Sequence, residues 1–368
     1  MNSLFAHIKQ FFSNSPKVKS VEGLQGLEKA DMLFHDLVAE GQVPGMAITA
    51  LKNGQTLLQK GYGYADLERK IQVDAKKTVF RIASISKCIT GLALGKMVEE
   101  GIVDLEASFY AYVPYYPKKT YDFILRQLAG HTAGIRGYRG KEYALNKDFS
   151  IKDSIAIFKN DPLLFEPGQG YLYNSFDFVL LSLAMQEASG VPFQDYVREN
   201  ILMPLGLKNT FSPMDFNVSS SARLPIGQAV ENKAEFYTKR ALSFKKAAEV
   251  NNSYKLAGGG FLSTSEDVAR LGQAILEQKL LKKETYDQLL TSQEVNGKPT
   301  FYGLGFQVSQ DVQGRPFVGH VGSSVGAYTN FFVYPEEELV VSVLINCTAP
   351  KVQEKLDGAI AAIFENIA

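Results

Sequence analysis

Residues Phe80–Thr90 read FRIASISKCIT and stand where a turn-rich segment gives way to an apolar helical pattern. Ser84 and Lys87 are three residues apart in this stretch, so a helix places their side chains on one face, one turn apart. A serine and a lysine in this arrangement can act as nucleophile and base. The serine also falls at the helix N-terminus, where unpaired backbone N–H groups favour a developing negative charge. The stretch therefore predicts a nucleophilic serine at the start of a central helix.

The S-x-x-K spacing alone is weak evidence, because ordinary composition produces about one or two copies by chance in a chain of this length. A second copy, SFKK at Ser243–Lys246, lies in a lysine-rich stretch without a turn-to-helix transition. We interpret that copy as a solvated face. A lysine that acts as base must lose its proton part of the time, and lowering its pKa by about three units costs roughly 4 kcal/mol. Packing alone would rarely select that arrangement, so the context of Lys87 favours a functional role.

The bulk composition excludes several classes of protein. The 368 residues are 45% hydrophobic, which is enough for a large core and about one to three domains. Lys+Arg and Asp+Glu number 39 each, so the net charge gives no case for a nucleic-acid partner. No apolar run approaches the roughly 20 residues of a transmembrane segment. The first residues hold no unbroken apolar run of about 7–15 residues, as a secretory signal would. We therefore expect a cytoplasmic protein, or a periplasmic one after removal of a signal.

Metal ligands are sparse in the sequence. Cys88 and Cys347 show neither a disulfide-type nor a metal-type spacing. The histidines form no H-E-x-x-H motif and no cluster with cysteine. There are four of them: His7, His35, His131 and His320. We expect a protein without a metal and without a cofactor.

Strand-like runs occupy both ends of the chain, and helical patterns occupy its middle. Gly45–Lys52 and Gln55–Tyr62 flank Asn53-Gly54, and Asn-Gly between such runs is a strong hairpin signal. Further strands are expected at Tyr302–Gln310, Pro316–His320, Tyr328–Tyr334 and Leu339–Asn346. Helices are expected over Leu24–Glu40, Ser84–Glu100, Asp122–Ala129, Ile151–Lys159, Ser175–Ser189, Glu266–Gln278 and Val352–Ile367. Apolar side chains within residues 4–12 also lie on one helical face.

This order of elements predicts an α+β fold. One antiparallel sheet is built from both ends of the chain and covered by terminal helices, with a mostly helical insertion between. We predict an N-terminal extension over residues 1–20. A sheet domain is predicted from residues 21–79 and 257–368, and a helical domain from residues 80–256. The segment 206–255 is expected to be polar and irregular.

Two further segments supply candidate functional groups. Tyr173 opens a helix, and a phenol hydrogen-bonded to a lysine can pass a proton to a leaving group. The alternative is an interfacial aromatic, since the chain holds 18 tyrosines. Farther on, His320-Val321-Gly322-Ser323 ends a strand. Its glycine lets a substrate lie against the strand, and the Ser323 N–H could join that of Ser84 as an oxyanion hole. The alternative there is a histidine that caps a sheet edge.

A competing motif fails on its context. Gly322–Gly326 matches G-x-S-x-G, which in α/β-hydrolases marks a strand-to-helix turn with the catalytic histidine later in the chain. Here a strand-like run follows, and no histidine lies beyond His320.

Taken together, these segments resemble the penicillin-recognising serine hydrolases. That family includes class C β-lactamases, D-alanyl-D-alanine carboxypeptidases, D-aminopeptidases, β-lactamase-like esterases and the mitochondrial-type serine β-lactamase-like proteins. The likeness runs from about Gly41 to Asn346. Its landmarks are Gly61–Asp66, Phe80–Lys87, Leu128–Ile135, Phe165–Gly168, Ala257–Asp267 and Tyr302–Phe306. The resemblance implies a β-lactamase/transpeptidase-like fold.

The resemblance also implies roles for individual residues. It makes Ser84 the acylated nucleophile and Lys87 its base partner. Tyr173 matches the tyrosine of the family's Y-x-N element, and His320-Val321-Gly322 matches its K-T-G or H-x-G strand. With Ser323, these residues form the predicted oxyanion and substrate-binding set.

The sequence departs from the family pattern at two places. Ser175 holds the position of the Y-x-N asparagine, with Asn174 one residue early. His320 stands where β-lactamases usually have lysine, and Val321 stands where they have a hydroxyl that binds the substrate carboxylate. We therefore expect a serine hydrolase that forms an acyl-enzyme on a small-molecule or peptide substrate: an ester, an amide or a D-amino-acid peptide. A true β-lactamase and a non-catalytic, penicillin-binding-like scaffold remain as alternatives. The sequence leaves the oligomeric state open.

Overall fold

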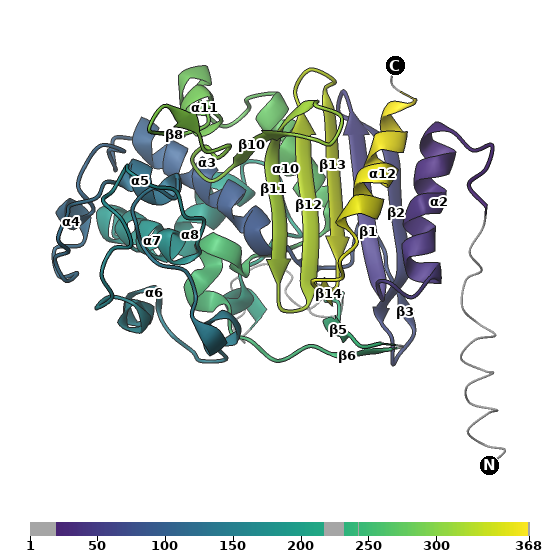
Figure 1. The fold of residues 1–368 in the computed structure, drawn as a ribbon, viewed down its shortest axis with the longest axis horizontal. Coiled ribbons are helices and arrows are strands. Elements are labelled where there is room, and N and C mark those ends of the chain that lie inside the picture. The colour runs from purple at the N-terminus through teal and green to yellow at the C-terminus, as the bar shows by residue number, and fades with distance from the viewer. Residues whose placement is uncertain (1–19, 217–231, 242, 367–368) are drawn as a thin grey trace, which may run out of the picture.

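A seven-stranded antiparallel sheet forms the framework of the protein (Figure 1). The computed structural model describes residues 20–216, 232–241 and 243–366, so the helical face predicted within residues 4–12 lies outside the described residues. The strands follow the order β10-β11-β12-β13-β1-β2-β3. Their bounds are β1 Gly45–Lys52, β2 Gln55–Asp66, β3 Ile71–Gln72, β10 Gln307–Gln310, β11 Pro316–Ser324, β12 Ala327–Tyr334 and β13 Leu339–Ile345. Because β1 pairs with β13, the two ends of the chain meet in the middle of the sheet, as predicted.

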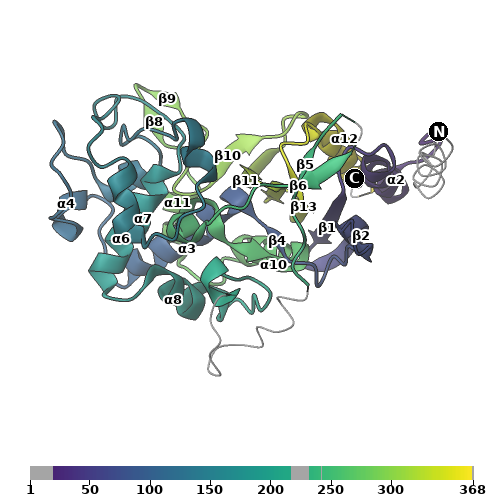
Figure 2. The same cartoon turned by 90° about the horizontal axis from the view of Figure 1, so that it is seen from below.

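Both faces of the central strands are buried, and alternate side chains serve separate cores. In β1, Ala47 and Leu51 join the core on one face, whereas Met46, Ile48 and Ala50 join the core on the other. Helices α2 (Gly26–Ala39) and α12 (Gln353–Phe364) cover the second face (Figure 1). Helix α10 (Ser265–Leu276) covers the first (Figure 2). The sheet is therefore a buried layer between helices.

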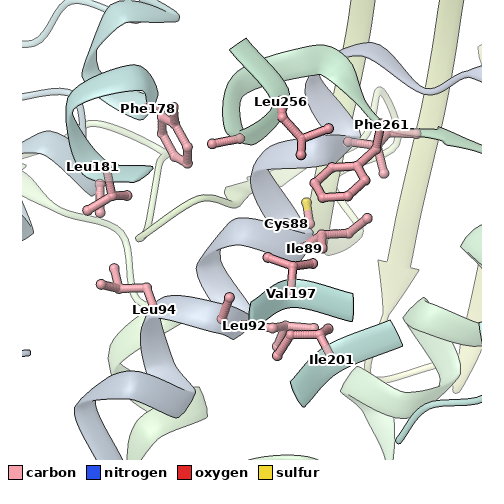
Figure 3. Close-up of a cluster of buried hydrophobic side chains, with 14 of the residues drawn as sticks. Cys88, Ile89, Leu92, Leu94, Phe178, Leu181, Val197, Ile201, Leu256 and Phe261 are labelled. Atoms are coloured by element: carbon pink, nitrogen blue, oxygen red, sulfur yellow. The ribbon is translucent and has the colours of Figure 1, made fainter. Parts of the chain in front are cut away.

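The first face also meets the helical part of the molecule, which is organised around α3 (Ser86–Glu99). Almost every residue of α3 is buried, as expected of a helix that is apolar on all sides. Figure 3 shows its neighbours in the core, drawn from several segments of the chain: Phe178, Leu181, Val197, Ile201, Leu256 and Phe261. The other helices are α4 Phe109–Tyr112, α5 Leu125–Ala129, α6 Ile151–Ser154, α7 Phe176–Ser189, α8 Phe193–Val197 and α11 Lys283–Leu289.

Short strands tie the segment before α3 to the rest of the chain. Strand β4 (Phe80–Arg81) pairs antiparallel with β7 (Leu262–Ser263). The remaining short strands are β5 Tyr237–Lys239, β6 Phe244–Lys246, β8 Glu294–Val295, β9 Lys298–Pro299 and β14 Cys347–Thr348. The β4–β7 pair holds the residues that lead into α3 beside those that follow Gly260.

Most predicted elements are present, with corrections at their bounds. Strand β11 continues four residues beyond the predicted end at His320, because Gly322–Ser324 still pair with β12. The predicted strand Tyr302–Gln310 is regular only over Gln307–Gln310. The segment 206–255, expected to be irregular, contains β5 and β6. The predicted domain boundaries remain a prediction.

The second S-x-x-K copy and the G-x-S-x-G match do not have the local structure that their chemistry would require. Phe244–Lys246 is the short strand β6, whose lysines are exposed. The G-x-S-x-G match spans the hairpin between β11 and β12 rather than a strand-to-helix turn. Within the described ranges, no helix is long and apolar enough to cross a membrane.

Candidate active site

Ser84 lies in a single 3₁₀ turn, η1 (Ala83–Ile85), directly before α3. The prediction had Ser84 as the first residue of the α-helix itself. Ala83 has a φ of 47°, in the left-handed region that non-glycine residues rarely adopt. Such a conformation costs on the order of 1–3 kcal/mol and persists where the surroundings enforce it. Here β4 precedes the turn and α3 follows it, so the strain lies at the entry to the nucleophile.

Gly322 allows strand β11 to lie directly against this turn. A Cβ at Gly322 would overlap Thr329 Oγ1 and would lie 3.0 Å from both Ala83 Cβ and Ser84 N. The Thr329 hydroxyl in turn donates to the Ile82 carbonyl oxygen at 3.1 Å. The sheet and the Ser84 turn are therefore fixed to each other at van der Waals distance, and only glycine fits between them.

Tyr173 and Lys87 approach Ser84 from the helical side. The Tyr173 hydroxyl donates to Ser84 Oγ at 2.7 Å. Lys87 Nζ donates to the Gly258 carbonyl oxygen at 2.6 Å and lies 4.8 Å from the centroid of the Tyr173 ring. The sequence suggested a hydrogen bond between the phenol and the lysine. Instead, the amine lies over the face of the ring.

The burial of Lys87 changes its protonation. Lys87 is 0% exposed, and desolvation lowers its pKa to about 7, against a smaller opposing effect of the Asp177 charge. Burial therefore brings the pKa of Lys87 close to neutral pH, where the neutral amine is available as a base. Desolvation raises the pKa of Tyr173, partly offset by its hydrogen bond to Ser84, so the phenol stays protonated. The site thus holds a neutral amine and a phenol donor next to one hydroxyl.

Two polar residues of α3 position the carbonyl group that Lys87 uses. The Thr90 hydroxyl donates to the Ala257 carbonyl oxygen at 2.9 Å. Ser86 Oγ accepts from the Phe261 N–H at 3.1 Å. These bonds hold the segment around Gly258 against α3, so the Gly258 carbonyl oxygen lies within hydrogen-bond distance of Lys87 Nζ.

A cavity of about 40 Å³ opens over Ser84. Among the predicted residues, Ser175 and Ser323 also line it. Asn174, one residue before Ser175, points elsewhere: it is 4% exposed and its amide donates to the carbonyl oxygens of Ile135 and Leu172. Ser175 rather than Asn174 is therefore the residue of this element that a substrate would meet.

His320 lies within strand β11, and its side chain does not line the cavity. It is 1% exposed, and its Nδ1 donates to the Val321 carbonyl oxygen at 2.7 Å. Its Nε2 is 3.0 Å from the Tyr302 hydroxyl, and in a neutral ring this nitrogen accepts. Burial and then the charge of Lys87 lower the pKa of His320 to about 3. The strand motif therefore contributes a neutral imidazole whose two nitrogens are both occupied.

A second buried pair, His131 and Asp177, was not recognised in the sequence as part of the site. Their side chains are 0% and 1% exposed, and His131 Nδ1 lies 2.8 Å from Asp177 Oδ2. The same oxygen accepts from the Asn174 amide at 2.6 Å. The His131 ring lies 4.6 Å from the Tyr173 ring, centroid to centroid. Burial lowers the pKa of His131 and raises that of Asp177, so both shift toward their neutral forms.

One signal of this pair was visible in the sequence. Asp177 is the one charged residue in the apolar run Phe176–Met185, and a buried carboxyl group requires a partner. The partner is distant in the chain, in the loop before α6, where His131 has a φ of 61°. Among the described residues, no group of three or more His, Cys, Asp or Glu side chains could hold a metal ion.

Comparisons with known proteins identify the family and the fold. The family model described as Beta-lactamase matches residues 30–364. The chain belongs to the β-lactamase family. It is 28% identical to the serine beta-lactamase-like protein LACTB, mitochondrial, of Homo sapiens, over 85% of this chain and 73% of that protein.

Solved structures of the family confirm the fold. The octameric penicillin-binding protein homologue from Pyrococcus abyssi superposes with a TM-score of 0.77 and 23% identity, covering 92% of this chain and 77% of its own. The D-amino acid amidase from Ochrobactrum anthropi SV3, complexed with L-phenylalanine, gives a TM-score of 0.79 at 20% identity, covering 92% and 99%. The predicted family and the predicted α+β, β-lactamase/transpeptidase-like fold are therefore correct.

Proposed function

We propose that the protein is a serine hydrolase in which Ser84 forms an acyl-enzyme with an ester, amide or peptide. The 2.7 Å hydrogen bond from Tyr173 to Ser84 Oγ carries the proposal, together with the buried Lys87 beside it. A base is most effective when its pKa lies near the working pH, and the pKa of Lys87 is about 7. A scaffold without catalysis would have no need of a buried lysine whose pKa lies near neutral pH.

Acylation proceeds by proton transfer and attack. The neutral amine of Lys87 takes the Ser84 proton as Oγ bonds to the substrate carbonyl carbon, and the C=O π electrons move to its oxygen. The N–H groups of Ser84 and Ser323 stabilise this oxyanion, each donor contributing about 3–4 kcal/mol. When the intermediate collapses, the leaving group takes the proton of Tyr173, and the Lys87 ammonium reprotonates the phenolate. Water then cleaves the acyl ester and restores Ser84.

The altered strand motif bears on the choice of substrate. His320 is neutral and buried, and Val321 offers no hydroxyl, so this strand lacks the groups that would bind the carboxylate of a β-lactam. Ser175 and Ser323 line the cavity over Ser84. Similarity in fold to a D-amino acid amidase supports an amide or ester substrate over rapid β-lactam turnover.

The test is a substrate panel of simple esters, D-amino-acid amides and β-lactams. Ser84→Ala should lower hydrolysis on the order of 10⁶-fold, as for other nucleophile deletions. Ser243→Ala, in the exposed second S-x-x-K copy, is the matched control and should retain full activity. Intact mass after a fluorophosphonate should show one adduct per chain, absent from Ser84→Ala.

Three outcomes would change the assignment. Retention of most ester hydrolysis by Ser84→Ala would remove Ser84 as nucleophile. Absence of any adduct and of any turnover would support the scaffold alternative. Rapid turnover of a chromogenic cephalosporin would establish a true β-lactamase instead.

A further inference from the structure

Two cationic side chains line cavities next to Ser84, one of them buried and the other partly buried. Lys255 is 7% exposed and lines the same cavity as Ser84. Its ammonium group donates to one neutral acceptor, the Tyr143 carbonyl oxygen, at 3.0 Å. Arg81, three residues before Ser84, donates from Nη1 to the Val325 carbonyl oxygen at 2.7 Å. An ammonium has three N–H donors and a guanidinium five, so each cation keeps donors for a ligand.

Neither cation has an acidic partner in the part of the chain that the structure describes. Lys255 and Arg81 take part in no ion pair there, and the Arg81 guanidinium instead stacks on the Phe236 ring at 4.1 Å. Arg136 shows the contrast. It is 5% exposed, close to the 7% of Lys255, but it pairs with both Glu142 and Asp161. A buried cation is rarely left without a counter-charge. Besides its carbonyl acceptor, Lys255 faces the rings of Tyr138 and Tyr254. Its missing acidic partner, together with that of the partly buried Arg81, therefore indicates an anion that arrives from outside.

The two cations line adjoining cavities. The cavity over Ser84 shares Val250 and Asn252 with a larger one of about 210 Å³, and Arg81 lines the larger one. A substrate whose carbonyl group lies at Ser84 can therefore extend past Lys255 toward Arg81. Burial and then the charge of Arg81 lower the pKa of Lys255 to about 8. Lys255 remains mostly protonated at neutral pH.

We propose that Lys255 and Arg81 form an anion subsite, and that the substrate of Ser84 carries a carboxylate within reach of both. The inference rests on the proposed function and names its substrate class: esters, amides or peptides with an anionic group near the scissile carbonyl. In this arrangement the anion is bound by Arg81, in the segment before η1, and by Lys255, in the segment before Gly258. The β11 motif does not bind it, because His320 is neutral.

The first test compares two esters of equal length, the 4-nitrophenyl monoester of glutaric acid and 4-nitrophenyl pentanoate. We expect kcat/KM at least tenfold higher for the anionic ester, and a preference that falls as salt is added. Lys255→Met should lower the ratio about 10- to 100-fold, as expected for a lost charge-assisted hydrogen bond. Lys255→Arg should keep it, because the charge remains. Lys76→Met, at an exposed lysine, is the matched control and should leave the ratio unchanged.

The second test measures binding without catalysis. In the Ser84→Ala background, calorimetry should give a Kd for glutaric acid monoanilide at least tenfold lower than for pentananilide. Adding Lys255→Met should abolish that difference. Equal affinities, or an ester ratio that Lys255→Met does not change, would overturn the subsite. Anion binding without hydrolysis of either ester would instead overturn the proposed function and leave the subsite standing.

Discussion

The helical side and the strand side of Ser84 are built from different kinds of groups. On the helical side, the titratable Tyr173 bonds to Oγ, Lys87 lies over the Tyr173 ring, and Asp177 and His131 form a buried pair. On the strand side, Gly322 supplies close approach, Ser323 lines the cavity, and His320 is neutral with both ring nitrogens bonded.

This difference separates proton transfer from substrate recognition. The helical side holds every group that moves a proton in the proposed mechanism, whereas the strand side contributes shape and backbone donors. Charge for recognition is available only from Lys255 and Arg81 among the groups discussed, and these belong to neither side. In such a fold, substitutions in the strand and in the segments that carry Lys255 and Arg81 can therefore change substrate specificity. The proton-transfer groups on the helical side can stay the same.

Among the residues on the two sides of Ser84, Lys87→Met should produce the largest effect, smaller only than that of Ser84→Ala. Removal of a general base typically lowers rates 10²- to 10⁴-fold, so kcat/KM for a small ester should fall by about 10³-fold or more. The proposed mechanism gives Lys87 a role in every step, which places the loss near the upper end of that range. Activity within tenfold of wild type would mean that the helical side does not hold the base.

The same variant should be more stable than wild type at low pH. The folded pKa of Lys87 is about 7 and lies below its unfolded value, so the unfolded chain binds more protons between these pKa values. The free energy of unfolding of wild type therefore rises with pH across this window. Lys87→Met removes this penalty and should gain up to about 4 kcal/mol at pH 6, and little above pH 10. Denaturant titrations at both pH values measure it, with Lys76→Met as control.

Gly322→Ala, on the strand side, should have the next largest effect on activity. The new Cβ would lie 3.0 Å from Ser84 N and would overlap Thr329 Oγ1, so β11 must move away from η1. Displacement of a positioned donor by about 1 Å costs on the order of 10²-fold, and overpacking costs about 1–3 kcal/mol of stability. Gly358→Ala is the control: α12 has open space there, and the change should stabilise by about 0.5–1 kcal/mol. Equal behaviour of the two variants would contradict the close approach.

The two sides also differ in how well the sequence predicted them. Ser84 and Lys87 were found because three-residue spacing on a helix is a local signal, as was Asn53-Gly54 for the β1–β2 hairpin. Tyr173 was found because it opens a helix after a turn. Gly322 and Ser323 were placed by the strand motif, although the 3.0 Å approach to Ser84 could not be read from it.

The remaining features depend on contacts between distant segments. His131 meets Asp177 because the segment after α5 packs against α7. Arg81 is brought toward the segment that follows Lys255 by the pairing of β4 with β7. The left-handed φ of Ala83 is likewise imposed from outside, since alanine has no preference for it. No local periodicity encodes these pairings, so the partners could not be predicted from the sequence.

Asp177→Asn should have a smaller effect, visible mainly in the pH profile. Burial favours the neutral form of Asp177, but any ionised fraction raises the pKa of Lys87, so Asp177→Asn should lower that pKa and keep the amine neutral at lower pH. The acidic limb of the pH profile of kcat/KM should therefore move to lower pH. The value of kcat/KM should also fall about tenfold, because Tyr173 is then less firmly held. Asp287→Asn, at an exposed carboxylate, is the matched control. An unmoved limb would mean that Asp177 is already protonated in the working range.

The smallest effect is expected at His320. Burial and the charge of Lys87 lower its pKa to about 3, so its ring should stay neutral from pH 5 to pH 8. The ¹H–¹³C NMR signal of the His320 ring, assigned by its absence from the spectrum of His320→Gln, should not shift between pH 5 and pH 8. Since the imidazole carries no charge and does not line the cavity, His320→Gln should also lower kcat/KM only a few-fold. A titration midpoint of His320 between pH 5 and pH 8 would mean that the strand side carries a titrating cation. Recognition of an anionic substrate would then no longer need Lys255 and Arg81, so this measurement decides which side of the nucleophile carries the charge.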